Sequence, residues 1–220
     1  MPKDACVLFD LDGTVIDSTE AIVESFGVAF RHFGDSVPDA SSIVSLIGHP
    51  LVSMFERLGV ASHRAMAYVE VYRGHYRTVC QEKTHLLPGV NEALQMVAPL
   101  ARLGVVTTKT ARFSKEILAH LGVGHYFQTV VGYEEVENAK PHPEPIRLAL
   151  KRLDEPKGAI WMIGDTPLDL IAARAAGVHS IGVLSGYATK EEMADHTPLI
   201  VAGVKEACAH IRKELMAQPD

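Results

Sequence analysis

CVLFDLDGTVIDS, residues 6–18, begins with four apolar residues that are typical of a buried β-strand. The run ends at Asp10 and Asp12, two carboxylates on either side of Leu11, and Gly13 follows as a turn residue. Ligands bind at the carboxyl ends of strands in open α/β sheets, so this arrangement predicts a site there. A strand's period of two points both carboxylates the same way, where their charges repel each other. A divalent cation relieves that repulsion, and all-oxygen ligands favour Mg²⁺.

The composition of the 220 residues indicates a folded, acidic chain. Hydrophobic residues make up 47% and charged residues 22%, which is enough apolar material for an ordinary core. The formal net charge of -6 argues against a nucleic-acid or membrane-surface partner. No apolar run approaches the roughly 18 residues of a membrane span. The first residues, MPKDA, lack the apolar segment of a signal peptide, so we expect none.

The three cysteines, Cys6, Cys80 and Cys208, are odd in number and far apart, with no Cys-x-x-Cys pair. This pattern predicts free thiols in a reducing cytoplasm. The sequence leaves open whether the protein is a monomer or a homodimer.

Residues 17–83 show helical periodicity and little sign of a strand. We expect four helices: residues 18–33, a short helix capped by Asp39 and reaching residue 46, residues 50–58, and a long helix capped by Ser62 and reaching residue 80. A crossover between parallel strands needs only one helix. Residues 17–83 are therefore predicted to form an inserted helical cap, placed to act as a lid.

The rest of the chain, residues 84–220, alternates between helices and strands. Strands are expected at 104–107, 129–132, 159–163, 180–184 and, weakly, 199–201, and helices at 89–100, 111–121, 143–153, 167–176, 190–195 and 203–216. The tail at 217–220 is expected to fray. With residues 1–16, this segment predicts an α/β core, a Rossmann-like doubly wound parallel sheet.

Two further segments carry candidate substrate-binding residues. At the end of the strand predicted at 104–107, hydroxyls and backbone amides next to a helix N-terminus favour an anion, which makes Thr107 and Thr108 candidate phosphate ligands. Thr is also an ordinary strand residue and Thr110 an ordinary helix cap, so this segment taken alone favours a structural role. Lys140 stands in a proline-stiffened loop, KPHPEP, where a fixed ammonium can screen carboxylates from a phosphoryl group.

A second apolar strand that ends in an acid occurs at IWMIGDTPLD, residues 160–169. Asp165 is expected to join Asp10 as a metal ligand from a different strand. Asp169 also fits a capping box with Thr166, since Pro167 follows at the first helical position. Both roles are compatible, and we expect Asp169 to support the metal site through water or Lys140 without binding Mg²⁺ directly.

Taken in order, these four segments resemble the four motifs of the haloacid dehalogenase superfamily of phosphohydrolases. The resemblance implies a phosphoric monoester hydrolase in which Asp10 attacks the phosphoryl group and forms an aspartyl-phosphate. Asp12 would act as general acid and base while its backbone carbonyl binds Mg²⁺. Mg²⁺, Lys140 and Thr107 would neutralise the phosphoryl charge.

The substrate class also follows from resemblance. Residues 71–76 and the loop that begins at Lys140 look most like those of phosphoglycolate phosphatases and their pyrophosphatase relatives, which implies a small phosphorylated metabolite as partner. Thr108 stands where these relatives usually carry Asn. A sugar phosphomutase and a non-catalytic phospho-acceptor or binding module are the alternatives, and Asp12 and the large insertion argue against the latter. The physiological substrate, its pathway and the cap residues that select it stay open.

Overall fold

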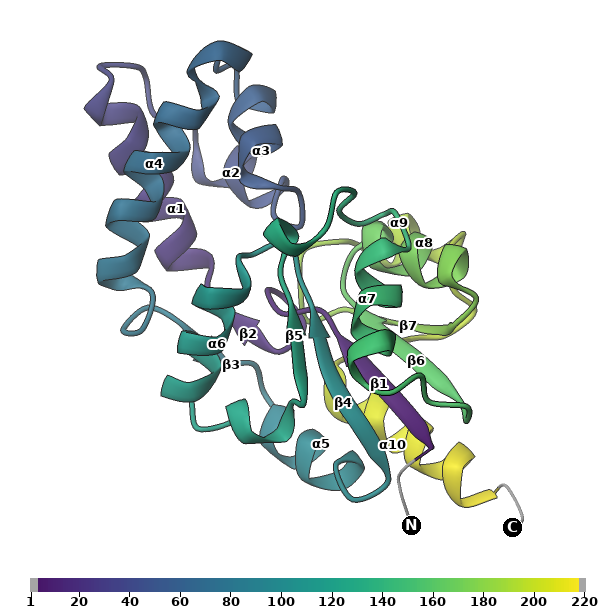
Figure 1. Cartoon of the computed structure of the whole chain (residues 1–220). Helices are drawn as coiled ribbons and strands as arrows, with labels where there is room; N and C mark the ends of the chain where they lie inside the picture. The colour runs from purple at the N-terminus through teal and green to yellow at the C-terminus, as the bar shows by residue number, and fades with distance from the viewer. Residues whose placement is uncertain (1–3, 218–220) are drawn as a thin grey trace. The chain divides into compact units, whose positions relative to one another are not determined.

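The computed structural model describes residues 4–217, which form two compact units. One unit contains the described residues up to Asp17 and from Leu86 onward, and the other contains Ser18–His85. The tail that was expected to fray lies, apart from Ala217, outside the described residues. Both units are drawn in Figure 1.

The first unit is built on one parallel sheet, as the alternation of helices and strands predicts. The six strands lie side by side in the order β5 (Thr129–Val131), β4 (Ala101–Val106), β1 (Ala5–Phe9), β6 (Ile160–Gly164), β7 (His179–Val183) and β8 (Ile200–Val201). The central strand β1 pairs with β4 and β6, and Phe9 lies opposite Val105 and Ile163. The segments that follow these three strands therefore meet at one edge of the sheet.

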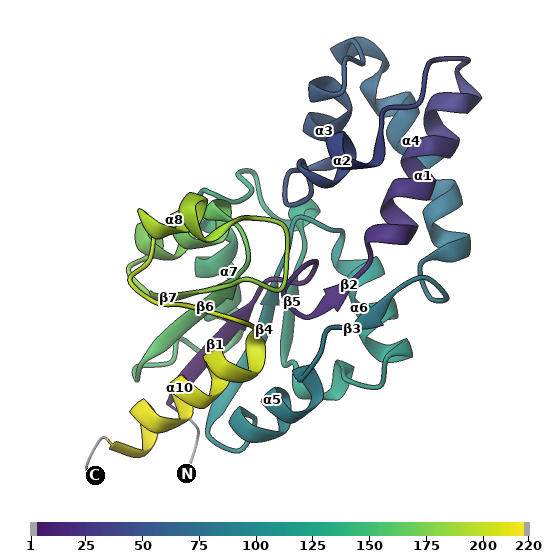
Figure 2. The same cartoon turned by 180° about the vertical axis from the view of Figure 1, so that it is seen from behind.

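Helices cover both faces of this sheet (Figures 1 and 2). They are α5 (Val90–Val97), α6 (Ala111–His120), α7 (Glu144–Arg152), α8 (Pro167–Ala176), α9 (Lys190–Ala194) and α10 (Val204–Ala217), with 3₁₀ turns η1 (Gly124–Tyr126) and η2 (Tyr133–Glu135). Cys6 and Leu8 of β1 pack against Ile146 of α7 and Ala172 of α8. Helices α5 and α10 pack together on the opposite face. Because β1 is buried on both faces, it reads as a continuous apolar run.

The second unit consists of α1 (Thr19–His32), α2 (Ala40–Val44), α3 (Leu51–Arg57) and α4 (Ser62–Val79), so the four predicted helices are present. Its core is aromatic, with ring contacts among Phe26, Phe30, Phe55, Tyr68 and Tyr72. Such contacts add to the burial of large apolar surfaces.

The capping residues of this unit are partly as predicted. The Asp39 carboxylate caps α2 by accepting the N–H of Ser42 at 2.8 Å. The prediction that Ser62 caps α4 was wrong, because Ser62 is the first helical residue and Ala61 occupies the cap position without a side-chain bond. Two short strands, β2 (Ile16–Asp17) and β3 (His85–Leu86), were not predicted and form a two-stranded sheet.

The bounds of β4 are the largest departure from the predicted elements. The strand begins at Ala101 and not at residue 104, because residues 101–103 pair with the first three residues of β1. Helix α5 correspondingly ends at Val97, before the predicted residue 100. Within residues 4–217, no helix is both long enough and apolar enough to cross a membrane.

Candidate active site

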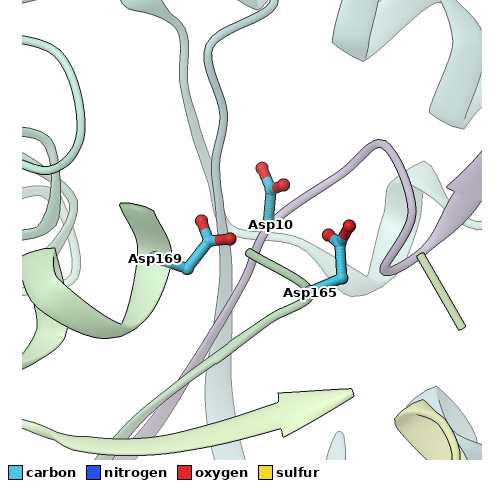
Figure 3. A group of neighbouring side chains, drawn as sticks. All are labelled: Asp10, Asp165 and Asp169. Carbon is cyan, nitrogen blue, oxygen red and sulfur yellow. The ribbon is translucent and has the colours of Figure 1, made fainter. Parts of the chain in front are cut away.

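Three carboxylates converge at the carboxyl edge of the parallel sheet (Figure 3). Asp10 follows β1, Asp165 follows β6, and Asp169 lies in the first turn of α8. One oxygen atom from each of the three lies within 4.8 Å of those of the other two, and all three side chains are buried. Asp10 is thus brought next to two residues that lie more than 150 positions further along the sequence.

Burial in this cluster raises the pKa values of two carboxyl groups, those of Asp10 and Asp165. Loss of hydration raises the pKa of Asp10 from 3.8 to about 7, although the Lys140 ammonium opposes that rise. Burial also raises the pKa of Asp165 well above its usual range, and the nearby charges of Asp10 and Asp169 add to the effect. Ionisation of Asp10 and Asp165 therefore places negative charge in the cluster that the protein alone compensates only in part.

The Lys140 ammonium supplies that partial compensation. Its Nζ atom lies 2.7 Å from Oδ1 of Asp10 and 2.5 Å from Oδ1 of Asp169, and it donates to the carbonyl oxygen of Val106 at 3.0 Å. Burial lowers the pKa of this ammonium, but the charges of Asp10 and Asp169 outweigh burial and hold the pKa above its ordinary value. Lys140 is thus charged, buried and fixed between the two carboxylates, unlike a solvated loop lysine.

The donor set fits a divalent cation. Three carboxylates, when ionised, carry three negative charges against the single positive charge of Lys140, so two negative charges lack a partner among these four side chains. The oxygen atoms of Asp10, Asp165 and Asp169 are hard ligands, which suit Mg²⁺ better than a softer metal. Asp169 also contacts Lys140, which is the arrangement expected if it supports the site indirectly.

Asp169 has a second structural role at the start of α8. Its Oδ2 atom accepts hydrogen bonds from the backbone N–H of Thr166 at 3.1 Å and from the Thr166 hydroxyl at 2.8 Å. The same carboxylate therefore caps the helix with one oxygen and binds Lys140 with the other. The two predicted roles of this residue are compatible in one geometry.

Asp12 lies outside the cluster of three carboxylates. Its Oδ1 atom lies 3.3 Å from Nζ of Lys109, a residue to which we had assigned no role. Asp12 stands in the turn after β1, whose conformation is fixed by the hydrogen bond from the N–H of Gly13 to the carbonyl of Ile16 at 2.8 Å. The side chain of Asp12 is thus placed beside the cluster and paired with a different cation.

The predicted phosphate-binding segment has a buried hydroxyl at its centre. Thr107 directly follows β4, its N–H donates to the carbonyl of Val131 at 3.0 Å, and its hydroxyl oxygen accepts the N–H of Lys109 at 3.1 Å. An accepting hydroxyl still has its own proton to donate. Thr108, the other predicted ligand, is partly exposed.

Two backbone amides at the start of α6 already have acceptors within the protein. The N–H of Ala111 donates to the Glu134 carboxylate at 2.9 Å, and the N–H of Phe113 donates to the Thr110 hydroxyl at 3.5 Å. Side chains of the protein itself therefore occupy these two helix donors.

Several residues at the site were missed in the sequence. The hydroxyl of Thr14 donates to Oδ1 of Asp165 at 2.9 Å, and the backbone N–H of Tyr187 donates to Oδ2 of Asp165 at 3.0 Å. Thr14 could have been found because it belongs to the same motif as Asp10. Tyr187 contributes a main-chain group, and no residue type encodes that contact.

Comparison with known proteins extends over nearly the whole chain. A family model described as haloacid dehalogenase-like hydrolase matches residues 7–183. A probable phosphatase, IndB, from Dickeya dadantii is 33% identical over 97% of this chain and 96% of its own length. A pyrophosphatase, PpaX, from Halalkalibacterium halodurans is 33% identical over 84% of this chain and 85% of its own. A phosphoglycolate phosphatase from Yersinia pseudotuberculosis is 30% identical, with 87% and 86% covered.

A solved structure agrees with the same grouping. The crystal structure of a predicted phosphatase from Clostridium acetobutylicum superposes with a TM-score of 0.85 and is 30% identical, covering 95% of this chain and 98% of that one. The family that matches is the one that the four sequence motifs resemble, so both the predicted fold class and the predicted resemblance are confirmed.

Proposed function

The chain belongs to the haloacid dehalogenase-like hydrolase family and is a phosphoric monoester hydrolase, and from this premise we propose that it hydrolyses a small phosphomonoester with Mg²⁺ through an aspartyl-phosphate on Asp10. One observation carries the proposal. The Asp10 carboxylate, at the end of the central strand, lies 2.7 Å from a buried ammonium and within a cluster of three carboxylates. Such a group is both fixed in place and close to a site for a divalent cation.

Asp10 is the nucleophile in this proposal. Lys140 binds Oδ1 of Asp10, which leaves Oδ2 as the attacking atom. The bond from Oδ2 to phosphorus forms as the bond from phosphorus to the alcohol oxygen breaks. Water then attacks the phosphorus atom of the aspartyl-phosphate, which releases inorganic phosphate and restores the Asp10 carboxylate.

Asp12 transfers the protons that this sequence of bonds requires. It donates a proton to the leaving alcohol oxygen and then takes one from the attacking water, a role that requires a carboxyl group near the nucleophile but outside the metal ligands. The Lys109 ammonium, 3.3 Å from Oδ1, keeps Asp12 oriented through both half-reactions.

Positive charge and hydrogen-bond donors around the phosphoryl oxygens stabilise the transition state. Lys140 provides a fixed ammonium, and the Thr107 hydroxyl provides a proton at the end of β4. Asp10, Asp165 and the backbone carbonyl of Asp12 would hold Mg²⁺, which would supply further positive charge to stabilise the phosphoryl oxygens. Asp169 keeps Lys140 in place.

Two substrate classes are supported. A small carboxylated phosphomonoester such as phosphoglycolate is favoured by the relative of that activity, and pyrophosphate is a second candidate because a pyrophosphatase is 33% identical to this chain. Both reactions require the same nucleophile and differ only in the leaving group.

We place the enzyme in the cytoplasm. Cys6, Cys80 and Cys208 are all free thiols and buried, in agreement with a reducing compartment. Burial raises the pKa of the Cys6 and Cys208 thiols to about 12, so neither forms the reactive thiolate at neutral pH.

The test is release of inorganic phosphate, with Mg²⁺, from phosphoglycolate, pyrophosphate, sugar phosphates, nucleotides and an aryl phosphate. Native protein and the exposed control Asp195→Asn should turn over at least one compound, while Asp10→Asn should be inactive. A preference for pyrophosphate would select the second candidate. An isomerised sugar phosphate without free phosphate would instead establish a mutase, and a stable phosphorylated Asp10 without turnover would establish a phospho-acceptor.

A further inference from the structure

The loop after β7, residues 184–188 (LSGYA), contacts both the carboxylate cluster and the turn after β1. We call this segment the β7–α9 loop. Its Tyr187 N–H donates to Oδ2 of Asp165 at 3.0 Å, and its Ala188 N–H donates to the backbone carbonyl of Asp165 at 3.3 Å. The Ser185 hydroxyl donates to the carbonyl oxygen of Gly13 at 2.9 Å. One short loop therefore holds two segments that follow different strands.

Gly13 and Gly186 leave room for the Asp165 side chain. A Cβ atom on Gly186 would approach the Asp165 carboxylate closer than 3.0 Å, a distance that Cβ atoms essentially never show. A Cβ atom on Gly13 would overlap the same carboxylate and would also lie 2.9 Å from Cε2 of Tyr187. The carboxylate of Asp165 is thus enclosed between the β7–α9 loop and the turn after β1.

The hydrogen bonds leave Asp165 able to bind a cation. Oδ1 accepts from the Thr14 hydroxyl and Oδ2 accepts from the Tyr187 N–H, one donor for each oxygen. A carboxylate oxygen has two lone pairs, so each can still act as a ligand. The two donors and the two glycines together restrict the carboxylate to the orientation in which it faces Asp10.

We propose that the β7–α9 loop is a positioning element that sets the Mg²⁺ affinity of the enzyme by fixing the orientation of Asp165. This inference rests on the proposed function, because it takes Asp165 as a metal ligand. Mg²⁺ demands near-ideal octahedral geometry, whereas Ca²⁺ accepts flexible coordination with more ligands. A misplaced Asp165 should therefore weaken Mg²⁺ binding more than Ca²⁺ binding.

The experiment compares Gly186→Ala with Gly203→Ala, a matched control in the same unit. A Cβ atom on Gly203 meets only one neighbouring atom, at an ordinary 3.6 Å. Ser185→Ala is the second variant, because it only removes a hydroxyl group and should fold even if Gly186→Ala does not. Calorimetric titration of the metal-free proteins with Mg²⁺ and with Ca²⁺, without substrate, gives the dissociation constants, and circular dichroism reports the fold.

Gly186→Ala should raise the Mg²⁺ dissociation constant about tenfold or more, as loss of an outer contact to a metal ligand commonly does. Ser185→Ala should raise it by a smaller factor, and Gly203→Ala should leave it unchanged. In both loop variants the ratio of Mg²⁺ to Ca²⁺ affinity should fall, a change that general destabilisation does not produce.

The role of the loop would be overturned if folded Gly186→Ala bound Mg²⁺ as tightly as the wild type. If Gly186→Ala does not fold, the same result with Ser185→Ala would overturn it. Equal losses for Mg²⁺ and Ca²⁺ would overturn it as well. A wild-type protein that binds no Mg²⁺ would instead overturn the metal dependence in the proposed function, so the two failures can be told apart.

Discussion

The Nζ atom of Lys109 lies 3.3 Å from Oδ1 of Asp12, and the two side chains are only 10% and 11% exposed. Lys109 follows β4 and Asp12 follows β1, and these strands are neighbours in the sheet. The pair therefore connects the turn that carries the nucleophile with the segment that carries the predicted phosphate ligands. A buried pair of this kind fixes orientation more than it adds stability.

Lys109→Met should lower kcat by about tenfold to a hundredfold, because a displaced acid-base group no longer reaches the reacting oxygen in the productive geometry. KM should change less, since the nucleophile and Lys140 keep their positions. Steady-state kinetics with the best substrate checks both parameters. The control is Lys115→Met, which removes an exposed lysine from α6. An unchanged kcat in Lys109→Met would contradict the role of this residue.

In the metal-free protein, Asp10→Asn should gain stability relative to the wild type as the pH rises. Because the folded-state pKa of Asp10 is raised from 3.8 to about 7, the folded chain holds a proton in this range that the unfolded chain has lost. The contribution of Asp10 to the free energy of unfolding therefore falls as pH rises through that window. Asn carries no charge at any pH and avoids this loss.

Thermal melting of wild type and Asp10→Asn in the presence of a chelator, at several values between about pH 4 and pH 8, measures the effect. The difference in melting temperature should be small at the acid end and should grow in favour of Asp10→Asn toward pH 8. A difference that does not change with pH would show that the Asp10 carboxyl has the same pKa in the folded and unfolded states. Asp195→Asn, an exposed change, is the control.

Lys140→Met should destabilise the protein by about 3 kcal/mol at pH 8, the usual scale for removing one partner of a buried ion pair. The change leaves Asp10 and Asp169 without the ammonium that lies 2.7 and 2.5 Å from them. The loss should be smaller at pH 5, where the raised pKa lets Asp10 take up a proton. Urea denaturation at both pH values measures the loss, with the exposed Lys151→Met as control. An equal loss of stability at both pH values would argue against this electrostatic explanation.

The sequence predicts the parallel sheet and the four segments of the site because each carries a local signal. β1 and β6 are apolar runs that end abruptly in an acid, and such runs are typical of strands buried on both faces. Their carboxyl ends necessarily meet in a parallel sheet, so Asp10 and Asp165 could be paired without a structure. Lys140 was identified because its Lys-Pro-x-Pro setting is similar to the family's third motif, since a lone loop lysine is ordinarily solvated.

Contacts made by common residue types or by the main chain could not be predicted. Lys109 is one lysine among many, and only the pairing of β1 with β4 brings it to Asp12. Glu134 occupies the N–H of Ala111 from a 3₁₀ turn that has no sequence signal. The extended start of β4 was missed because Ala101 and Arg102 are not strong strand formers, and their pairing with β1 outweighs local preference.

Inhibition by the product, inorganic phosphate, should identify the group that binds the phosphate when it is measured in variants of Thr107 and Glu134. If the Thr107 hydroxyl donates to the phosphoryl group, Thr107→Val should raise the inhibition constant of inorganic phosphate about tenfold, the effect of one hydrogen bond to a charged group. If the amides of α6 bound the phosphate instead, Glu134→Ala would free the N–H of Ala111, remove a negative charge and lower that constant. We expect Glu134→Ala to leave the constant unchanged, because that carboxylate serves as a helix cap and the anion binds at the end of β4. Tighter phosphate binding in Glu134→Ala, with no effect of Thr107→Val, would move the phosphate site to the helix.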